Sequence, residues 1–221
     1  MVRGRFITME GGEGAGKSTQ VPLLITALEQ AGVAALATRE PGGSPGAEAI
    51  RGLLLEGDGE RWDAIGEALL LLAARRDHVA KLIEPALANG TWVVSDRFAD
   101  STLAYQGYGR GLPLADLAML HRFALGGFAP DLTLILDLPV EIGLGRAAVR
   151  PAAADRFERL DAAFHERLRK GFREIAAAEA KRCFLIDANR DPASVHRAVL
   201  EAVEQRLGLR LNPINSAAEK T

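Results

Sequence analysis

The sequence predicts an α/β fold built on one parallel sheet. Short apolar runs of strand length alternate along the 221 residues with longer segments in which apolar residues recur every three or four positions. Most of the apolar runs end directly in polar or glycine-rich residues, which is typical of strands that lead into loops. Strands separated by helices form parallel units with right-handed crossovers. We therefore expect a five-stranded parallel sheet that is flanked by helices.

The same periodicities predict the individual elements. The expected strands are Arg5–Glu10, Val33–Thr38, Trp92–Ser95, Leu132–Leu136 and Phe184–Ile186. The expected helices are 17–30, 61–88, 114–125, a long amphipathic one whose apolar stripe runs from Phe157 to Ile175, and 192–207. The chain has no internal repeat and no low-complexity linker. We therefore expect one domain over residues 1–210, with a short lid at about 146–157 and a polar tail at 211–221.

Composition limits the classes of function. The net charge of −2 argues against nucleic-acid binding, because that affinity comes mainly from a basic surface. The single cysteine, Cys183, lies in an apolar run and is expected to be a buried thiol. The N-terminus leads straight into a strand-like run, so we expect no signal peptide. No apolar stretch approaches the ~20 residues that a membrane span needs. We expect a cytoplasmic protein.

Four segments with polar or glycine-rich residues follow the predicted strands. They are the loop at 11–18, Arg39–Gly43, Asp96-Arg97 and Asp137. In open parallel sheets, ligands bind beyond the carboxyl ends of the strands. We therefore expect these four segments to converge on one edge of the sheet, where a ligand would bind.

The first of these segments is a phosphate-binding loop. Residues 11–18 fit the pattern G-x-x-x-x-G-K-S at every fixed position and lie between a strand and a helix. Such a loop points successive backbone N–H groups at phosphate oxygens, and the helix that follows adds its dipole. Lys17 would bridge the β- and γ-phosphates, and the Ser18 hydroxyl would ligate Mg²⁺. The pattern predicts a P-loop NTPase fold and an ATP site that comprises Gly11, Gly12, Glu13, Gly14, Ala15, Gly16, Lys17, Ser18 and Thr19.

Together the motifs are similar to those of thymidylate kinases of the bacterial type. The similarity runs from Phe6 to about Val203. It rests on the glycine loop, Arg39–Gly43 (Arg-Glu-Pro-Gly-Gly), Asp96–Phe98, Ser101–Gly107 and the lid end Asp155–Glu158. The resemblance implies a kinase, usually a homodimer, that converts ATP and dTMP to ADP and dTDP with Mg²⁺. It thereby implies a role in the synthesis of dTTP.

The resemblance also assigns residues to the acceptor, dTMP. Arg97 and Arg39 would hold its phosphate, which suits arginine because the planar guanidinium pairs bidentately with phosphate. Arg75 matches an arginine near the phosphate and base, although a solvated helix face beside Arg76 would also explain it. Glu13 would accept a hydrogen bond from the sugar 3′-hydroxyl.

The resemblance implies that a second group of residues contacts the base and the 2′ side of the sugar. Ser101 and Tyr105 match positions that contact them, and Gln106 is a further dTMP-binding candidate. A tyrosine packed against C2′ would disfavour a ribose hydroxyl. Leu71 occupies the position at which the family usually has a phenylalanine. Leucine can cover the base, but it gives up an aromatic stacking contribution of about 1 kcal/mol.

The catalytic charge is expected to come from the lid. One subclass of the family carries a catalytic arginine directly after the loop acid, but this chain has Gly14 there. The lid segment contains Arg146, Arg150 and Arg156 instead. Arg150 is the expected catalytic arginine, and Arg146 would stack on adenine. Asp96 would act on Mg²⁺, directly or through water, although a capping role at the strand end is an alternative.

Two other functions remain open on the sequence alone. The chain could be a kinase for another nucleoside monophosphate, or a regulatory P-loop NTPase that binds a partner in its ATP state. No N-K-x-D guanine motif supports a GTPase switch. A regulatory switch needs only one phosphate-binding site. The loop together with Arg39, Arg75 and Arg97 predicts two such sites, which argues against a switch.

The assignment of Arg150 predicts a kinetic phenotype. Replacing its guanidinium in Arg150→Ala removes charge from the transferring phosphoryl group but leaves the acceptor contacts in place. We expect kcat to fall by orders of magnitude with little change in dTMP affinity. Steady-state ADP release measures both quantities, and an unchanged kcat would remove Arg150 from this role.

Overall fold

The five expected strands form one parallel sheet. The structure, a computed structural model, describes residues 2–56, 61–149, 156–157 and 160–213. The strand order is β2-β3-β1-β4-β5, and every neighbouring pair is parallel. The strands are β1 (Phe6–Gly11), β2 (Ala35–Arg39), β3 (Trp92–Asp96), β4 (Leu132–Asp137) and β5 (Cys183–Asp187). The predicted sheet is thus confirmed, with strand ends that differ by one or two residues.

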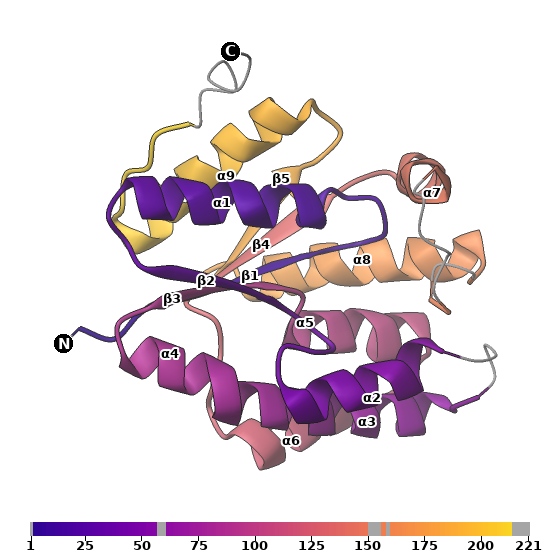
Figure 1. Ribbon diagram of the computed structural model, residues 1–221. Coiled ribbons are helices and arrows are strands. Elements are labelled where there is room, and N and C mark those ends of the chain that lie inside the picture. Colours follow the sequence, from indigo (N-terminus) through magenta and orange to yellow (C-terminus); the bar gives the residue numbers. More distant parts are fainter. Residues whose placement is uncertain (1, 57–60, 150–155, 158–159, 214–221) are drawn as a thin grey trace.

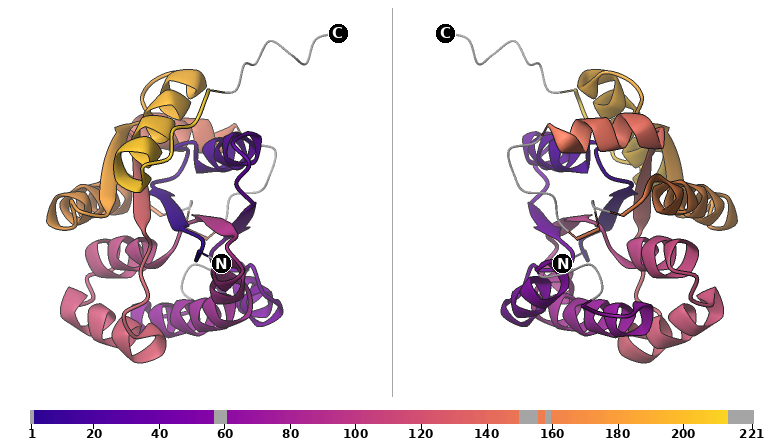
Figure 2. Two further views of the ribbon diagram at one scale, coloured as in Figure 1. Left: turned by 90° about the vertical axis from the view of Figure 1, so that its left-hand side faces the viewer. Right: turned by 90° about the vertical axis from the view of Figure 1, so that its right-hand side faces the viewer.

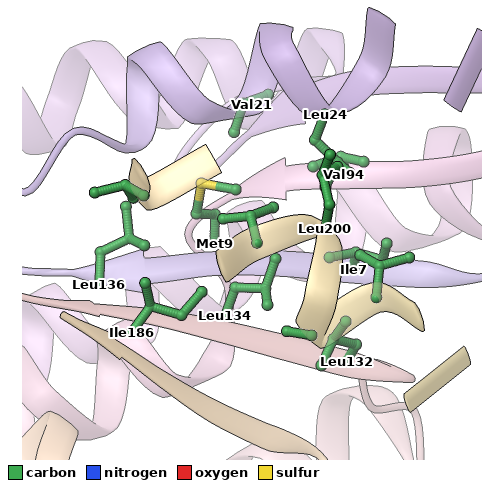
Figure 3. Close-up of a cluster of buried hydrophobic side chains, with 14 of the residues drawn as sticks. Ile7, Met9, Val21, Leu24, Val94, Leu132, Leu134, Leu136, Ile186 and Leu200 are labelled. Carbon is green, nitrogen blue, oxygen red and sulfur yellow. The ribbon is translucent and has the colours of Figure 1, made fainter. Parts of the chain in front are cut away.

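One face of the sheet is covered by the first and last helices. These are α1 (Lys17–Gln30) and α9 (Pro192–Leu207), which lie together above the sheet in Figure 1. The buried cluster between them and the strands includes Ile7 and Met9 of β1, Leu134 of β4 and Leu200 of α9 (Figure 3). Burial of each such side chain contributes about 1.5–3 kcal/mol. This core fixes the start of α1 against the end of β1.

Most of the remaining helices lie on the other face and beside it (Figure 2). They are α2 (Pro45–Leu55), α3 (Ala64–His78), η1 (Val79–Ile83), α4 (Glu84–Ala88), α5 (Ala99–Thr102), η2 (Leu103–Gly109), α6 (Leu114–Leu125) and α8 (Ala162–Ala178). Phe6 points from β1 to this face and packs edge-on against Phe98 at 4.9 Å between ring centroids. Successive residues of β1 therefore serve two different cores, as expected for a strand buried on both faces.

Several helix predictions need correction. The helix expected at 61–88 is divided into α3, the π-helical turn η1 and α4. Pro85 cannot donate a backbone hydrogen bond and its ring excludes the carbonyl four residues earlier, which explains the wider turn before it. The helix predicted from Phe157 begins only at Ala162, where Asp161 caps the N–H of Phe164 at 2.7 Å.

Three helical segments were missed. They are α2, the pair α5 and η2, and α7 (Val140–Ala148). α2 begins at Pro45 and contains two glycines, and η2 contains Gly107 and Gly109, so glycine and proline suggested loops there. Part of the expected lid (150–155 and 158–159) and most of the tail (214–221) lie outside the described residues. In the described part of the chain, no helix combines the length and apolar character that crossing a membrane requires.

Candidate active site

A large pocket lies at the carboxyl edge of the sheet. Its volume is about 610 Å³, which suits small-molecule ligands. The phosphate loop, the ends of β2 and β3, α2, α3, η2, α7 and the connection from β5 to α9 all contribute to its wall. Segments far apart in the sequence thus meet where the topology of a parallel sheet places ligands.

The phosphate loop forms one end of this pocket. Its lysine, Lys17, is buried and donates from Nζ to the carbonyl oxygens of Gly11 at 3.1 Å and Gly12 at 2.9 Å. Burial lowers the pKa of Lys17, Arg97 lowers it further, and the nearby carboxylates oppose both effects. α1 starts at Lys17, so the unsatisfied N–H groups of its first turn face the loop. Both features provide donors for phosphate.

An arginine, an acid and a tyrosine meet beside the loop. The Glu13 carboxylate accepts from Nη2 of Arg97 at 2.7 Å and from the Tyr105 hydroxyl at 2.5 Å. The Arg97 guanidinium also lies over the Tyr105 ring, 4.9 Å from its centroid, and donates to the Gly11 carbonyl at 3.1 Å. Three residues predicted from separate motifs are therefore joined in one cluster.

The backbone of Arg97 adopts an unusual conformation. Its φ of 71° lies in the left-handed region, which costs an L-residue about 1–2 kcal/mol. Glu10 stabilises the residues that follow: its carboxylate accepts from the Phe98 N–H at 2.7 Å and from the Ser101 hydroxyl at 2.5 Å. Burial and the neighbouring Asp100 raise the pKa of Glu10 to about 7, although these hydrogen bonds and Arg97 act in the opposite direction.

Arg75 is buried in the pocket wall, so it does not belong to a solvated helix face. Its Nε donates to Glu40 at 2.7 Å. Its Nη2 donates to the Phe98 carbonyl at 3.0 Å and to the Thr102 hydroxyl at 2.9 Å. Within the described chain, Nη1 has no hydrogen-bond partner, and Arg75 lines the pocket.

A second buried carboxylate, Glu67, organises another part of the wall. It accepts from Arg156 at 2.5 Å, from Arg110 at 2.9 Å and from the amide of Gln106 at 3.1 Å. Arg156 is only 1% exposed. The next residue, Phe157, packs edge-on against Tyr105 at 5.6 Å between centroids. Glu67 therefore connects α3 and η2 to the described end of the predicted lid.

The other end of the pocket is lined from α7 and from the loop after β5. Arg146 of α7 lines it and donates weakly to the Ala188 carbonyl at 3.4 Å. Arg190 lines it as well. The expected catalytic residue Arg150 lies outside the described residues. Arg39 is exposed at the rim, where its guanidinium contacts both carboxylate oxygens of Glu48 at 3.1 Å.

Most of the predicted residues thus line a single pocket. They are Glu13, Gly14, Ala15, Gly16, Lys17, Ser18, Thr19, Arg39, Leu71, Arg75, Asp96, Arg97, Ser101, Tyr105, Gln106 and Arg146. Gly11 and Gly12 contribute the carbonyls that hold Lys17. Asp137 lies at the expected edge of the sheet, at the end of β4, but it does not line this pocket: its carboxylate accepts from Arg169 at 2.8 Å and Arg173 at 2.7 Å. Burial raises the pKa of Asp137, but these arginines outweigh burial and lower it.

Sequence reasoning missed several residues of the site. Arg51, Phe157 and Arg190 line the pocket. Behind it, Glu10 accepts from Ser101 and Glu67 accepts from Gln106, two residues of the wall. Glu10 was read only as the end of a strand and Glu67 as part of a helix. An acidic residue at an otherwise apolar buried position is the signal that could have found both, since buried carboxylates need partners.

Comparison with known proteins identifies the family. A sequence model described as thymidylate kinase matches residues 9–199. The chain belongs to the thymidylate kinase family. It is 56% identical to a thymidylate kinase of Caulobacter vibrioides, over 95% of this chain and 100% of that one. It is also 56% identical to one of Rhodopseudomonas palustris (strain ATCC BAA-98 / CGA009), over 99% of this chain and 95% of that one.

A solved structure agrees in fold. The thymidylate kinase of Ehrlichia chaffeensis matches with a TM-score of 0.74 at 35% identity, over 91% of this chain and 99% of that one. The family carries the P-loop NTPase fold, so the expected fold class is confirmed.

Gly14 distinguishes this chain from the subclass with an arginine in the loop. Its φ of 66° lies in the left-handed region, and a Cβ atom built on it would lie 2.1 Å from the Gly143 carbonyl oxygen of α7. Conversely, a Cβ on Gly143 would lie 2.4 Å from the carbonyl oxygen of Glu13. Two glycines thus allow the loop backbone to touch α7, and no side chain fits at position 14.

This contact predicts that Gly14→Ala destabilises the protein more than Gly16→Ala. Gly16 also has a left-handed φ, 96°, but a Cβ there meets nothing within 4 Å. Both variants carry about 1–2 kcal/mol of backbone strain, and only Gly14→Ala must also displace α7. We expect a melting temperature lower by a further several degrees, at about 2–4 °C for each kcal/mol. Equal melting temperatures for the two variants would contradict the contact.

Proposed function

We propose that this chain transfers the γ-phosphoryl group of ATP to dTMP and releases ADP and dTDP. The supporting observation is that one pocket combines two phosphate-binding ends. The loop around Lys17 forms one end, and the guanidinium groups of Arg75 and Arg97 form the other. A phosphoryl transfer between two nucleotides requires both anions to be held in line with their charge neutralised.

On the acceptor side, Arg97, Arg75 and Arg39 bind the phosphate of dTMP. Glu13 accepts a hydrogen bond from the 3′-hydroxyl, and Tyr105 packs against C2′ and disfavours a ribose. The cluster of Glu13, Arg97 and Tyr105 supports this assignment, because the sugar and its phosphate need neighbouring acceptor and donor groups.

The base occupies the part of the pocket that Leu71, Ser101 and Gln106 line. The Gln106 amide donates to Glu67, and its buried oxygen has no hydrogen-bond partner among the described residues. This oxygen is an acceptor that a base could satisfy after a small movement. Leu71 covers the base without aromatic stacking.

On the donor side, Lys17 leaves the loop carbonyls to bridge the β- and γ-phosphates, and Arg146 stacks on adenine. Arg190 lines the same end and offers a second guanidinium there. Together with Arg97 and Arg150, Lys17 neutralises the charge of the transferring group. The protein contributes position and charge rather than covalent chemistry.

Mg²⁺ is the metal that the residues of this site fit. Ser18 and Asp96 both line the pocket and supply the oxygen ligands that Mg²⁺ prefers. The described residues contain no cluster of three or more His, Cys, Asp or Glu that would hold a metal by themselves. This fits an ion that shares its coordination with nucleotide phosphates and water. When bound, Mg²⁺ neutralises charge on the phosphates.

The protein works as a homodimer through α3 and α6, which contact each other (Figure 1). Large apolar side chains of both helices are exposed, namely Ile65 (58%), Leu69 (48%), Met119 (56%) and Phe123 (89%). An apolar patch of this kind on neighbouring helices indicates a protein interface. A cytoplasmic location belongs to the same proposal, since ATP is available there.

The acceptor preference tests the proposed reaction. With Mg-ATP and each nucleoside monophosphate in turn, we expect rapid ADP release with dTMP and slow release with CMP, UMP or GMP. Lys17→Ala should abolish transfer with the fold intact, and it serves as the inactive control. Slow turnover of dTMP beside fast turnover of another monophosphate would refute the assignment of the substrate.

The proposed interface predicts a change of oligomeric state. In Phe123→Glu, a carboxylate would be buried against the partner, so the dimer should dissociate. Light scattering should then give the mass of one chain instead of two. Val2→Glu is the matched control, because Val2 is 89% exposed but lies outside α3 and α6. A Phe123→Glu protein that keeps the mass of the wild type would exclude this surface.

A further inference from the structure

A chain of buried polar side chains extends behind Arg75. The Thr38 hydroxyl and Nε2 of His78 are 2.8 Å apart, and Nδ1 of His78 is 3.2 Å from Oε1 of Glu40. The other carboxylate oxygen, Oε2, accepts from Nε of Arg75 at 2.7 Å. His78 is fully buried and does not line the pocket, so it cannot touch a substrate directly.

The direction of these hydrogen bonds follows from the groups involved. A carboxylate only accepts, so Nδ1 of His78 carries the hydrogen that is donated to Glu40. Nε2 then accepts from the Thr38 hydroxyl. The backbone of Gly43 packs closely against the ring: a Cβ atom built on Gly43 would lie only 2.3 Å from Nε2 of His78. This contact restricts movement of the ring. The imidazole is therefore fixed in both position and orientation.

This arrangement determines how Glu40 pairs with Arg75. Arginine and carboxylate tend to form a bidentate fork that uses two N–H groups. Here His78 holds Oε1, and the guanidinium contact is made through Oε2 and Nε alone. Nη2 is held by the Phe98 carbonyl and the Thr102 hydroxyl. Only Nη1 remains without a partner in the described part of the chain.

We infer that His78 is a positioning residue for the acceptor phosphate: it holds Oε1 of Glu40 away from the edge formed by Nε and Nη2 of Arg75, so that Nη2 keeps its contacts with Phe98 and Thr102 and Nη1 stays directed to the phosphate. This inference rests on the proposed function, in which Arg75 binds dTMP. Loss of the Nδ1 contact would free Oε1 to pair with Nη2, which would draw Nη2 from Phe98 and Thr102 and turn Nη1 away from the phosphate. The expected defect is therefore in the binding of dTMP and not in that of ATP.

Two substitutions separate the two contacts of the ring. The amide of Asn reaches the place of Nδ1, and that of Gln reaches the place of Nε2. His78→Asn can therefore still donate to Glu40, whereas His78→Gln keeps only the contact with Thr38. We expect His78→Gln to raise KM for dTMP about tenfold, which corresponds to the free energy of one hydrogen bond to a charged group. We expect His78→Asn to stay within about twofold of the wild type, and KM for ATP to be unchanged in both.

Two further variants make the outcome decisive. His196→Gln removes another buried imidazole, on α9, and should leave KM for dTMP unchanged; both of its ring nitrogens are buried without hydrogen-bond partners in the described residues. Arg75→Ala tests the underlying assignment. If Arg75→Ala raises KM for dTMP but both His78 variants behave alike, whether as wild type or equally impaired, the inference is wrong. If Arg75→Ala leaves KM for dTMP unchanged, the proposed acceptor site itself fails.

Discussion

The pocket depends on one strained backbone residue, Arg97. Its left-handed conformation turns the chain sharply at the end of β3 and brings its guanidinium over the phosphate loop. The buried carboxylate of Glu10 stabilises this turn through Phe98 and Ser101. Because Glu10 belongs to β1, the strand that leads into the phosphate loop, the two ends of the pocket share one support. Any movement of β1 would displace both.

Buried carboxylates recur behind the pocket. Glu10, Glu40 and Glu67 are all at most 6% exposed, and each is hydrogen bonded to residues of the wall. A buried charge is costly unless it is paired. Here Glu40 holds Arg75, Glu10 holds Ser101 and Glu67 holds Gln106 in place before any ligand arrives, so that little reorganisation is needed when two polyanions enter. The arrangement explains why so much negative charge lies behind a site for anions.

Local pattern predicted the sheet and the phosphate loop, and the family resemblance supplied most of the other predicted residues that line the pocket. The glycine loop and Arg97 lie directly beyond strand ends, and parallel topology brings strand ends together. Asp137 shows the limit of that argument, because a residue at the right edge can still turn toward another helix. Glu67 and His78 could not be assigned from pattern, since their partners are 35 or more residues away from them and only the tertiary structure defines them.

The pair of glycines at 14 and 143 also bears on how the two subclasses of this family diverged. An arginine at position 14 would need α7 to retreat, and a larger residue at 143 would press on the loop. Each change alone would force the loop and α7 apart, and neither change relieves the clash that the other causes. An arginine at position 14 therefore requires a displacement of α7 and not only a change of one side chain. Backbone contact between two distant segments thus restricts which residues the phosphate loop can carry.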